Sequence, residues 1–465
     1  MTSTGTSRFH VGWMVQAARG RLIRGNAGGN LSGVSNDTRT IAPGELYVAL
    51  RGANFDGHRF CAEAIEKKAR GVLIESGRAR ELDFPGDACV IEAPDTLRAL
   101  QRIARAHRRR FDIPVIAITG SNGKTSTKEM AAAILGTRLR TLKTEGNLNN
   151  LIGLPLMLLR LDEGHDAAVL ELGMNHRGEI RDMTRICDPT IGVITNVGPA
   201  HVEHFRNVDD IARAKGELYR TMRPGTIVVN ADDPRVVAQA RGLPHRRLSF
   251  GLRARARIRA ERIVSRGIEG EAFTLVHAGR RTRVSLPAPG RHSVSNALAA
   301  AGAAFAVGLG PLEVAEGLAA FENTKWRMQI MKVGRNIILI NDCYNANPAS
   351  MEAALRSFAE MKGEARGLAV LGDMLELGRK TEEAHREVGR LVRDLGIEVL
   401  FTYGKAAEAI ADGAAGGGGV PEVHRGRSHG EIASRLRRMA RGNDWILVKG
   451  SRGMEMEKIV EGFVG

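Results

Sequence analysis

The sequence predicts an α/β protein of three domains, each built on a β-sheet that helices cover. Short apolar runs rich in β-branched residues, among them VIAIT, IGVIT and GLAVLG, alternate with stretches of helical spacing. This alternation is typical of mostly parallel sheets. A length of 465 residues suits two to four domains. The basic string AHRRR ends the first group of strands, and we place the domains at residues 1–108, 109–322 and 323–465.

The outer domains each combine strand-like and helical strings. In the first, GELYVALRG and GVLIES are strand-like, and CAEAIEKKA and LRALQRIARAHRR have helical spacing. Its segment NDTRTIAPGELYVALRGANFDGHRF is rich in glycine and polar residues, as expected of a binding loop. In the last, NIILIND, GLAVLGD, EVLFTYG and WILVKG alternate with helical strings, which predicts an open, Rossmann-like sheet.

The central domain is expected to be a P-loop-type domain with a mostly parallel sheet. Its strand candidates are VIAIT, AAVLELG, IGVITNVG and GTIVVNADD, with helices between them. From about residue 256 to 287 the pattern changes to alternating apolar and polar residues with glycine-containing turns. We therefore expect a small antiparallel insertion there.

Composition limits the classes of partner. Apolar residues make up 43% and charged residues 26%, as in a folded protein. Aromatic residues make up only 4%, which argues against stacking platforms for single-stranded nucleic acid. The net charge of +16 is not gathered in one block with aromatic residues. It fits a substrate carrying phosphates and carboxylates, and we expect no nucleic-acid partner.

The cysteines and the hydropathy pattern indicate the compartment. Cys61, Cys89, Cys187 and Cys343 are widely spaced and form no CxxC pair, as expected of buried thiols in a reducing environment. No run reaches the ~18 apolar residues of a membrane span, and the first residues lack a cleavable apolar segment. We expect a cytoplasmic protein without an integral membrane segment.

A glycine loop between a strand and a helix is the strongest single motif. In PVIAITGSNGKTSTKEMAAAIL, an apolar strand precedes GSNGKTS, and helical spacing follows up to Gly136. Backbone N–H groups and a helix N-terminus at such a loop bind phosphate. The loop is shorter than the general pattern, because Ile118 stands where a glycine is usual; the alternative is a simple turn with a surface lysine. The phosphate-binding candidates are Gly120, Ser121, Asn122, Gly123, Lys124, Thr125 and Ser126, with Thr125 also placed to hold Mg²⁺.

Three further residues of the central domain are metal-site candidates. Glu171 ends the strand AAVLELG, where ligands bind in parallel sheets, although a helix-capping role is equally compatible with its position. His201 follows the strand IGVIT, near His204, and a histidine ligand indicates a second divalent site. Lys215 lies on a predicted helix, where most lysines are merely solvated; carbamylation would make it an anionic ligand.

Polar loops also follow strands of the last domain. In NDCYNANPAS, the side chains of Asp342, Tyr344, Asn345 and Asn347 precede Pro348, which is expected to open a helix. VKGSRG has the same form. Several such loops on one sheet indicate a second substrate wall, in which a carboxylate or phosphate would be bound by Lys449, Ser451 and Arg452.

Together these motifs resemble those of the Mur ligases. ITGSNGKTSTKEM, TEGNLNNLIGLPL, LELGMNHRGEI, ITNVGPAHVEHF, AKGELY, NADDP and NDCYNANPASM occur in the family's order, and the resemblance covers about residues 35–456. It implies an N-terminal domain for the UDP end of a substrate, a central ATPase domain and a closing C-terminal domain. Within the family, NDCYNANPASM and LGDMLELG are most similar to the members that add D-alanyl-D-alanine.

The resemblance also implies residue roles. Lys124, His201 and Lys215 are implied in catalysis, the last as a carbamylated lysine. Metal contacts are implied for Thr125, Glu171, His201 and Lys215, and nucleotide contacts for Asn296, Arg327 and Asp342. The family often has Gly-Arg where this chain has Trp326-Arg327. Substrate contacts are implied for Ser35, Thr38, Arg39, Asn147 and Asn150, beside the C-terminal residues named above.

The activity implied is an ATP-dependent amide ligation in peptidoglycan precursor synthesis. ATP and two Mg²⁺ ions are implied as cofactors, with UDP-N-acetylmuramoyl-tripeptide and D-alanyl-D-alanine as substrates and a monomer as the expected state. One alternative is a related ligase that adds a diamino acid, or glutamates to a folate; it would carry a DNPR loop in the last domain, whereas the similar DDPR string, Asp232 to Arg235, lies in the central one. Another is a basic ATP-binding module acting on nucleic acid, which predicts salt-dependent binding.

Overall fold

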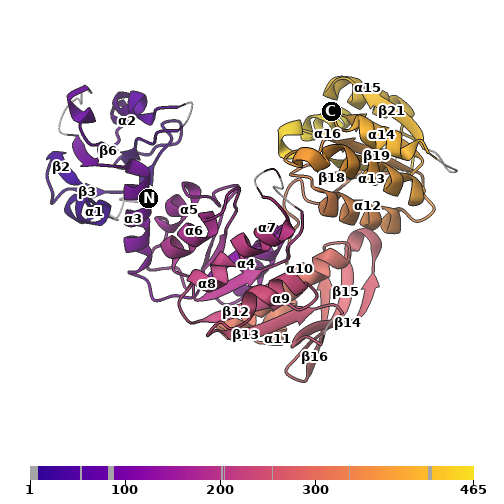
Figure 1. Cartoon of the computed structure of the whole chain (residues 1–465), viewed down its shortest axis with the longest axis horizontal. Helices are drawn as coiled ribbons and strands as arrows, with labels where there is room; N and C mark the ends of the chain where they lie inside the picture. Colours follow the sequence, from indigo (N-terminus) through magenta and orange to yellow (C-terminus); the bar gives the residue numbers. More distant parts are fainter. Residues whose placement is uncertain are drawn as a thin grey trace.

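Three sheets follow one another along the chain. The computed structural model describes residues 9–52, 55–81, 88–199, 203, 205–253, 255–334, 336–416 and 421–465. Within these residues the strands form sheets of five, nine and six strands and a separate pair. In Figure 1 the three larger sheets lie around an open arc, with the nine-stranded sheet at its base. Most neighbouring strands are parallel and helices accompany every sheet, which confirms the predicted α/β fold.

The N-terminal sheet has the strand order β2-β7-β6-β5-β4, and only the β2–β7 pairing is antiparallel among the described strands. Strands β5 and β6 confirm the two predicted strings. Its strands are β2 (Arg21–Arg24), β4 (Val34–Ser35), β5 (Leu46–Val48), β6 (Gly71–Glu75) and β7 (Cys89–Ala93). Beside them lie the pair β1 (Phe9–His10) and β3 (Asn30–Leu31) and the helices α1 (Val11–Ala18), α2 (Cys61–Glu66) and α3 (Thr96–Arg108).

The central sheet has the order β16-β15-β14-β13-β12-β11-β8-β10-β9. It is parallel from β9 to β14 and antiparallel from β14 to β16, which confirms the predicted insertion. The strand β13 was not predicted, because its string RRLSFG begins with two exposed arginines. The strands are β8 (Val115–Thr119), β9 (Thr141–Lys143), β10 (Ala167–Glu171), β11 (Ile191–Ile194), β12 (Thr226–Asn230), β13 (Arg246–Gly251), β14 (Ile258–Ser265), β15 (Glu271–His277) and β16 (Arg280–Leu286).

Helices of the central region connect and cover these strands. The helix α4 ends at the cap residue Gly136, as the sequence predicted, and begins at Lys124, within the predicted loop GSNGKTS. The helices are α4 (Lys124–Leu135), α5 (Gly153–Leu158), α6 (Glu179–Cys187), α7 (Val208–Lys215), α8 (Glu217–Thr221), α9 (Pro234–Ala240), α10 (Arg291–Val307) and α11 (Pro311–Ala319).

The C-terminal sheet has the order β17-β18-β22-β19-β20-β21, with the edge strand β17 antiparallel. Its strands are β17 (Gln329–Val333), β18 (Ile337–Asp342), β19 (Gly367–Gly372), β20 (Val399–Tyr403), β21 (Glu422–Gly426) and β22 (Trp445–Lys449). Its helices are α12 (Pro348–Lys362), α13 (Thr381–Asp394), α14 (Glu408–Ala414), α15 (His429–Met439) and α16 (Glu457–Val464). Short 3-10 helices are η1 (Gly57–Phe60), η2 (Arg78–Glu81), η3 (Gly267–Glu269), η4 (Gly378–Lys380) and η5 (Arg452–Met454).

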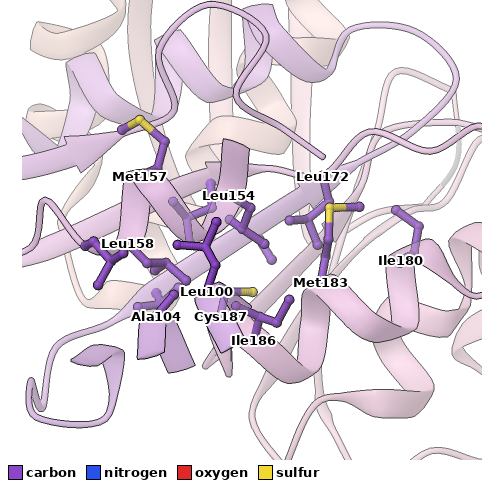
Figure 2. Packing of buried hydrophobic residues seen from close by; sticks show 14 of the residues in the cluster. Leu100, Ala104, Leu154, Met157, Leu158, Leu172, Ile180, Met183, Ile186 and Cys187 are labelled. Atoms are coloured by element: carbon purple, nitrogen blue, oxygen red, sulfur yellow. The ribbon is translucent and has the colours of Figure 1, made fainter. Parts of the chain in front are cut away.

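One continuous hydrophobic core joins the N-terminal sheet to the central one. The helix α3 packs against α5 and α6, and their buried side chains interdigitate in Figure 2. The residues labelled there are Leu100, Ala104, Leu154, Met157, Leu158, Leu172, Ile180, Met183, Ile186 and Cys187. The boundary predicted at residue 108 therefore lies inside a shared core, and all three domain limits remain predictions.

Two further expectations concern cysteines and membranes. The four cysteines are buried and unpaired, as predicted. Among the described helices, none combines the length and the apolar character needed to cross a bilayer.

Leu100→Ala is expected to lower the free energy of unfolding by about 2–5 kcal/mol, because it opens a cavity in the core between α3, α5 and α6. Arg98→Ala, on the exposed face of the same helix, is the control and is expected to change it by less than about 0.5 kcal/mol. Urea unfolding of both variants measures this. Equal effects of the two substitutions would contradict the shared core.

Candidate active site

A cavity of about 1030 Å³ lies between the carboxyl edge of the central parallel sheet and the C-terminal sheet. Its walls come from the loop before α4, the ends of β10 and β11, the start of α10, and the loops after β18 and β22. Ligands of open α/β sheets bind at this edge, because the loops that follow parallel strands meet there. The cavity is therefore the candidate active site.

The glycine loop after β8 requires its glycines. Gly120 and Gly123 have positive φ values of 156° and 79°. A Cβ atom on Gly120 would lie 1.8 Å from the Thr195 hydroxyl, and one on Gly123 would lie 2.2 Å from Asn296 Oδ1. The backbone therefore passes against its neighbours more closely than any side chain allows.

The N-terminus of α4 is the part of this loop that is open to an anion. The 12-residue helix has no side-chain cap, so its first N–H groups point into the cavity region unbonded by a capping side chain. Fewer backbone N–H groups between Gly120 and Thr125 are available to an anion than the sequence predicted. Asn196 accepts the N–H of Ser121 at 2.9 Å and that of Asn122 at 3.0 Å, which removes these two donors.

Lys124 lines the cavity at the start of α4, so it is not the solvated surface lysine of the alternative interpretation. Its Nζ donates to the Gly120 carbonyl at 3.0 Å. Burial lowers the pKa of Lys124; the nearby Glu171 carboxylate opposes this shift, and the cation of Arg327 adds to it.

Glu171 is bound in the cavity wall and does not cap a helix. The Thr125 hydroxyl donates to its Oε2 at 2.7 Å, and the Asn149 amide donates to its Oε1 at 2.8 Å. The Glu171 side chain is buried at the end of β10. Sequence reasoning did not single out Asn149, although it lies in the motif TEGNLNN. The hydroxyl, carboxylate and amide of these three side chains offer the oxygen ligands that Mg²⁺ prefers. Among the described residues, no cluster of three or more His, Cys, Asp or Glu side chains is placed to hold a metal ion.

Lys215 is a buried amine at the end of α7, not a solvated one, with 2% of its surface exposed. Its Nζ donates to the same Gly120 carbonyl at 3.0 Å. No carboxylate of the described residues pairs with it. Burial lowers the pKa of Lys215 well below its ordinary value, and the like charge of Lys124 lowers it further.

The predicted ligand His201 and the neighbouring His204 lie outside the described residues. Glu203, which is described, donates its backbone N–H to the Glu376 carbonyl, in the loop after β19, at 3.2 Å. The DDPR string is structural: Asp233 caps α9, and Asp232 accepts the N–H of Leu252 at 2.6 Å.

Asn296, on α10, is buried behind the glycine loop and lines the cavity. Its neighbour His292 also lines the cavity and was missed, because the sequence string RHSVSN holds no spacing that marks it. Burial lowers the pKa of His292; Asp342 opposes this shift and Lys449 adds to it.

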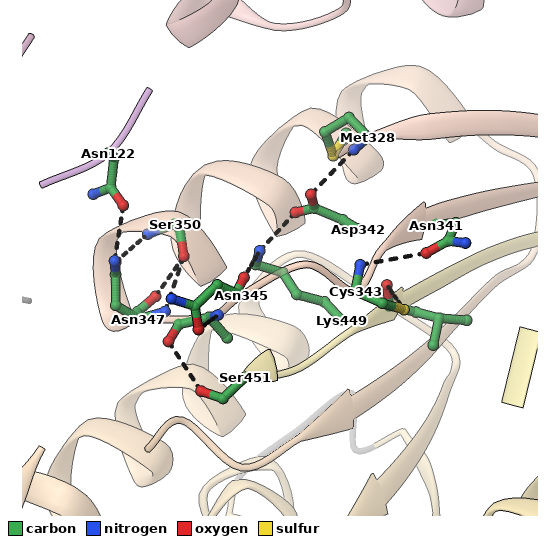
Figure 3. Close-up of polar contacts among 12 residues, drawn as sticks. Asn122, Met328, Asn341, Asp342, Cys343, Asn345, Asn347, Ser350, Lys449 and Ser451 are labelled. Atoms are coloured by element: carbon green, nitrogen blue, oxygen red, sulfur yellow. Dashed lines mark hydrogen bonds and ion pairs between the residues drawn. The ribbon is translucent and has the colours of Figure 1, made fainter. Parts of the chain in front are cut away.

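Two side chains from the C-terminal region bond directly to the glycine loop. Arg327 Nη2 donates to the Thr125 hydroxyl oxygen at 2.8 Å. Asn347 Nδ2 donates to Asn122 Oδ1 at 2.8 Å, a contact drawn in Figure 3. Asn347 also caps α12, which begins at Pro348 as predicted. The cavity is therefore closed on one side by residues more than 200 positions away along the chain.

The three candidates at the end of β22 and in the loop after it, Lys449, Ser451 and Arg452, differ in how accessible they are to a ligand in the cavity. Lys449 is buried and donates to Asp342 Oδ2 at 2.6 Å and to the Asn345 carbonyl at 2.9 Å (Figure 3). Ser451 is buried, bonds the Ala346 carbonyl at 3.2 Å, and is not part of the cavity lining. Arg452 is half-exposed and lines the cavity.

The remaining candidates divide between two places. Asn147 and Asn150 line the cavity. Ser35, Thr38 and Arg39 form a turn outside it, in which Arg39 Nη2 pairs with Asp37 at 2.6 Å. Hydrogen bonds from the Arg39 side chain and backbone N–H lower the pKa of Asp37 to about 2.

Comparisons with known proteins give a consistent result. Three family models match: the Mur ligase family catalytic domain at residues 30–108, the Mur ligase middle domain at 118–304, and the Mur ligase glutamate ligase domain at 326–452. A UDP-N-acetylmuramoyl-tripeptide–D-alanyl-D-alanine ligase of Bacillus subtilis is 36% identical over 93% of each chain. The structure of MurF from Acinetobacter baumannii matches with a TM-score of 0.88 at 30% identity and covers 98% of each chain. MurF of Thermotoga maritima, solved with ADP, has the same fold, with a TM-score of 0.80 at 23% identity and coverage of 93% of this chain and 96% of that one.

Lys215→Met is expected to raise the free energy of unfolding, and by more at pH 7 than at pH 10. Because the pKa of Lys215 is lowered on folding, the unfolded chain binds a proton that the folded chain does not, and this lowers the free energy of unfolding. The destabilisation by Lys215 is complete below the pKa of the folded state and vanishes above the ordinary pKa of 10.5, so its removal stabilises the protein more at pH 7. Urea unfolding at both pH values, in buffer free of carbon dioxide, measures the difference. The control is Lys405→Met, at an exposed lysine. A stabilisation that does not change with pH would contradict the buried neutral amine.

Proposed function

The chain belongs to the Mur ligase family, and we infer that it joins D-alanyl-D-alanine to UDP-N-acetylmuramoyl-tripeptide, with ATP converted to ADP and phosphate. The observation that carries this function is the match to UDP-N-acetylmuramoyl-tripeptide–D-alanyl-D-alanine ligases along more than nine-tenths of both chains. The cavity agrees, because a phosphate-binding helix N-terminus faces polar loops that suit a peptide substrate. The reaction is a step of peptidoglycan precursor synthesis and so of cell-wall formation. A monomer in the cytoplasm is part of the proposal.

The chemistry needs an activated carboxylate, because an unmodified one would have to expel oxide. The peptide carboxylate oxygen attacks the γ-phosphorus of ATP, the bond to ADP breaks, and an acyl phosphate forms. The dipeptide amine then attacks the acyl carbon, the carbon–oxygen bond to phosphate breaks, and the amine loses a proton. An acyl phosphate hydrolyses in water, so a cavity walled by both sheets protects it.

Charge on the transferred phosphoryl group is the main electrostatic demand. We assign Lys124 and the N-terminus of α4 to the γ-phosphate, with Arg327 approaching it from the C-terminal side. Asn296 and Asp342 are assigned to the nucleotide. These assignments are supported by the convergence of all four side chains on one cavity.

Mg²⁺ fits the donor set at Glu171. Thr125, Glu171 and Asn149 offer hydroxyl, carboxylate and amide oxygens within one hydrogen-bonded group, and oxygen is the ligand that Mg²⁺ prefers. Thr125 keeps one lone pair after donating to Glu171 and accepting from Arg327. Bound there, the ion would supply positive charge to the phosphate oxygens. We assign a second ion to His201 and a carbamylated Lys215.

The neutral amine of Lys215 is the group that a carbamate requires. An unprotonated amine attacks carbon dioxide, a nitrogen–carbon bond forms, and a proton is released. The product is an anion in place of an amine, which reverses the charge that Lys215 would otherwise carry beside Lys124. Burial without a carboxylate partner among the described residues supports this assignment.

Substrate contacts are assigned by position. Ser35, Thr38 and Arg39 are proposed to bind the uridine nucleotide, and the remaining candidates the peptide and dipeptide. Lys449 and Arg452 both line the cavity. Arg452 is half-exposed and pairs through Nη1 with Glu457 at 2.6 Å, and its other N–H groups suit a carboxylate. The peptide candidates are Asn147, Asn150, Tyr344, Asn345, Asn347, Lys449, Ser451 and Arg452.

Phosphate release from ATP with UDP-N-acetylmuramoyl-tripeptide tests the function. Release is expected with D-alanyl-D-alanine and to fall at least about 100-fold with single amino acids, meso-diaminopimelate or glutamate, because only the dipeptide fills its subsite. Mass spectrometry of the product identifies the amide. Turnover with a diamino acid or with glutamate, but not with the dipeptide, would assign the chain to another ligase reaction.

Lys124→Ala is the matched control for that assay. It is expected to lower the rate at least about 100-fold while leaving the thermal midpoint near that of the wild type, because it removes charge at the phosphate and no core contact. Near-normal turnover of the variant would remove the phosphate-loop assignment.

Lys215→Ala is expected to lower turnover at least about 100-fold, and added formate or acetate is expected to restore part of it. A short carboxylate can occupy the space and charge of the carbamate in the variant. The rate is measured against carboxylate concentration, with Lys124→Ala as the variant that carboxylates should not restore. Unchanged activity of Lys215→Ala would rule out the carbamate.

A further inference from the structure

Arg327 lies in a segment, 326–328, with an unusual backbone. Trp326 has a φ of +63° and Met328 a φ of +46°. Two residues other than glycine therefore adopt the left-handed conformation on either side of the arginine. Such conformations are strained for residues of this size and persist where neighbouring contacts hold them. The contacts that hold this segment are therefore informative.

The backbone of the segment is fastened from both sides. The Tyr344 N–H donates to the Trp326 carbonyl at 3.1 Å. The Met328 N–H donates to Asp342 Oδ1 at 3.0 Å, and Lys449 Nζ holds the other oxygen of that carboxylate at 2.6 Å. Figure 3 shows Met328, Asp342 and Lys449 as one connected row. Asp342 thus binds the backbone of the segment that carries Arg327, and Lys449 holds Asp342 in place.

The Arg327 side chain is held by an aromatic ring. Its guanidinium carbon lies 4.0 Å from the centre of the Tyr344 ring. Its Nη2 reaches the Thr125 hydroxyl at 2.8 Å. Its Nε is buried and has no partner among the described residues. A ring face attracts the cation without using any of its N–H groups, so the Nε–H remains for an anionic ligand although Nη2 donates to Thr125.

We propose that Tyr344, with the Asp342–Lys449 pair behind it, positions the Arg327 guanidinium toward the phosphoryl group, with Arg327 Nε directed to an anionic oxygen of that group. This inference rests on the proposed function and refines it: Tyr344 and Lys449, assigned above to the peptide, and Asp342, assigned above to the nucleotide, act on the segment of Arg327 instead. Tyr344, Asp342 and Lys449 are then positioning residues: they set where the charge of Arg327 stands during phosphoryl transfer.

The chain offers a matched pair of variants at Tyr344. Tyr344→Phe keeps the ring face and removes the hydroxyl, whereas Tyr344→Leu keeps an apolar side chain and removes the ring. The Phe variant is expected to lose less than about twofold in kcat, and the Leu variant about tenfold. KM for the tripeptide and for the dipeptide is expected to stay within about twofold in both, because neither substrate touches the ring.

A double variant shows whether Tyr344 acts through Arg327. Arg327→Ala is expected to lower kcat by about 100-fold or more. Tyr344→Leu is expected to add less than about twofold in that background, because the ring then has no guanidinium to place. A merely structural role of the ring would lower the rate by the same factor in both backgrounds, and would overturn the proposal.

A fluorine series keeps the proposal testable if the Leu variant fails to fold. Phenylalanine with one, two and three ring fluorines at position 344 keeps the shape of the side chain and weakens its negative face in steps. A stepwise fall in kcat at constant thermal midpoint is expected. No change across the series, or a Phe variant as slow as the Leu variant, would overturn the proposal. A wild-type enzyme that forms no amide would instead overturn the proposed function, before any variant is compared.

Discussion

A single backbone carbonyl, that of Gly120, accepts hydrogen bonds from the amines of both Lys124 and Lys215, each at 3.0 Å. Burial and the repulsion between these two amines lower the pKa of Lys215 well below its ordinary value. Glu171 supports the charge of Lys124, and no described carboxylate supports that of Lys215. The same carbonyl therefore holds two amines, of which only Lys124 has a carboxylate nearby among the described residues. Thr125 and Asn149, both bonded to Glu171, keep the supporting carboxylate in place.

The two outer sheets are attached to the central one in different ways. A shared apolar core binds the helix α3 to α5 and α6. At the cavity, the C-terminal side is held by polar contacts, from Arg327 to Thr125 and from Asn347 to Asn122. Replacing a polar contact by hydrogen bonds to water changes the free energy little, whereas exposing a buried apolar core to water costs much more. The cavity is thus closed by the contacts that are easiest to replace by a substrate.

Particular residues show how far prediction from sequence reached. Gly136 marked the end of α4, and Pro348 marked the start of α12, because these signals are local. β13 and the edge strands β17 and β21 were missed, since edge or charged strands lack the long apolar run that marks a buried strand. In the site, the position of Glu171 at a strand end was informative. Asn149 gave no separate signal, although it binds the same carboxylate.

The sequence by itself determined the glycine loop between a strand and a helix, the general alternation of strands and helices, and the resemblance to a family, because glycines, caps and apolar runs act over a few residues and motif order is read along the chain. Only the tertiary structure decided which polar side chains are free. Lys449 and Arg452 are three residues apart, yet Lys449 is buried against Asp342, whereas Arg452 is half-exposed and pairs with Glu457. Arg327 and Thr125 are distant in sequence and in contact in space. Availability of a charged group depends on its partners and its burial, and these are set by packing between distant segments.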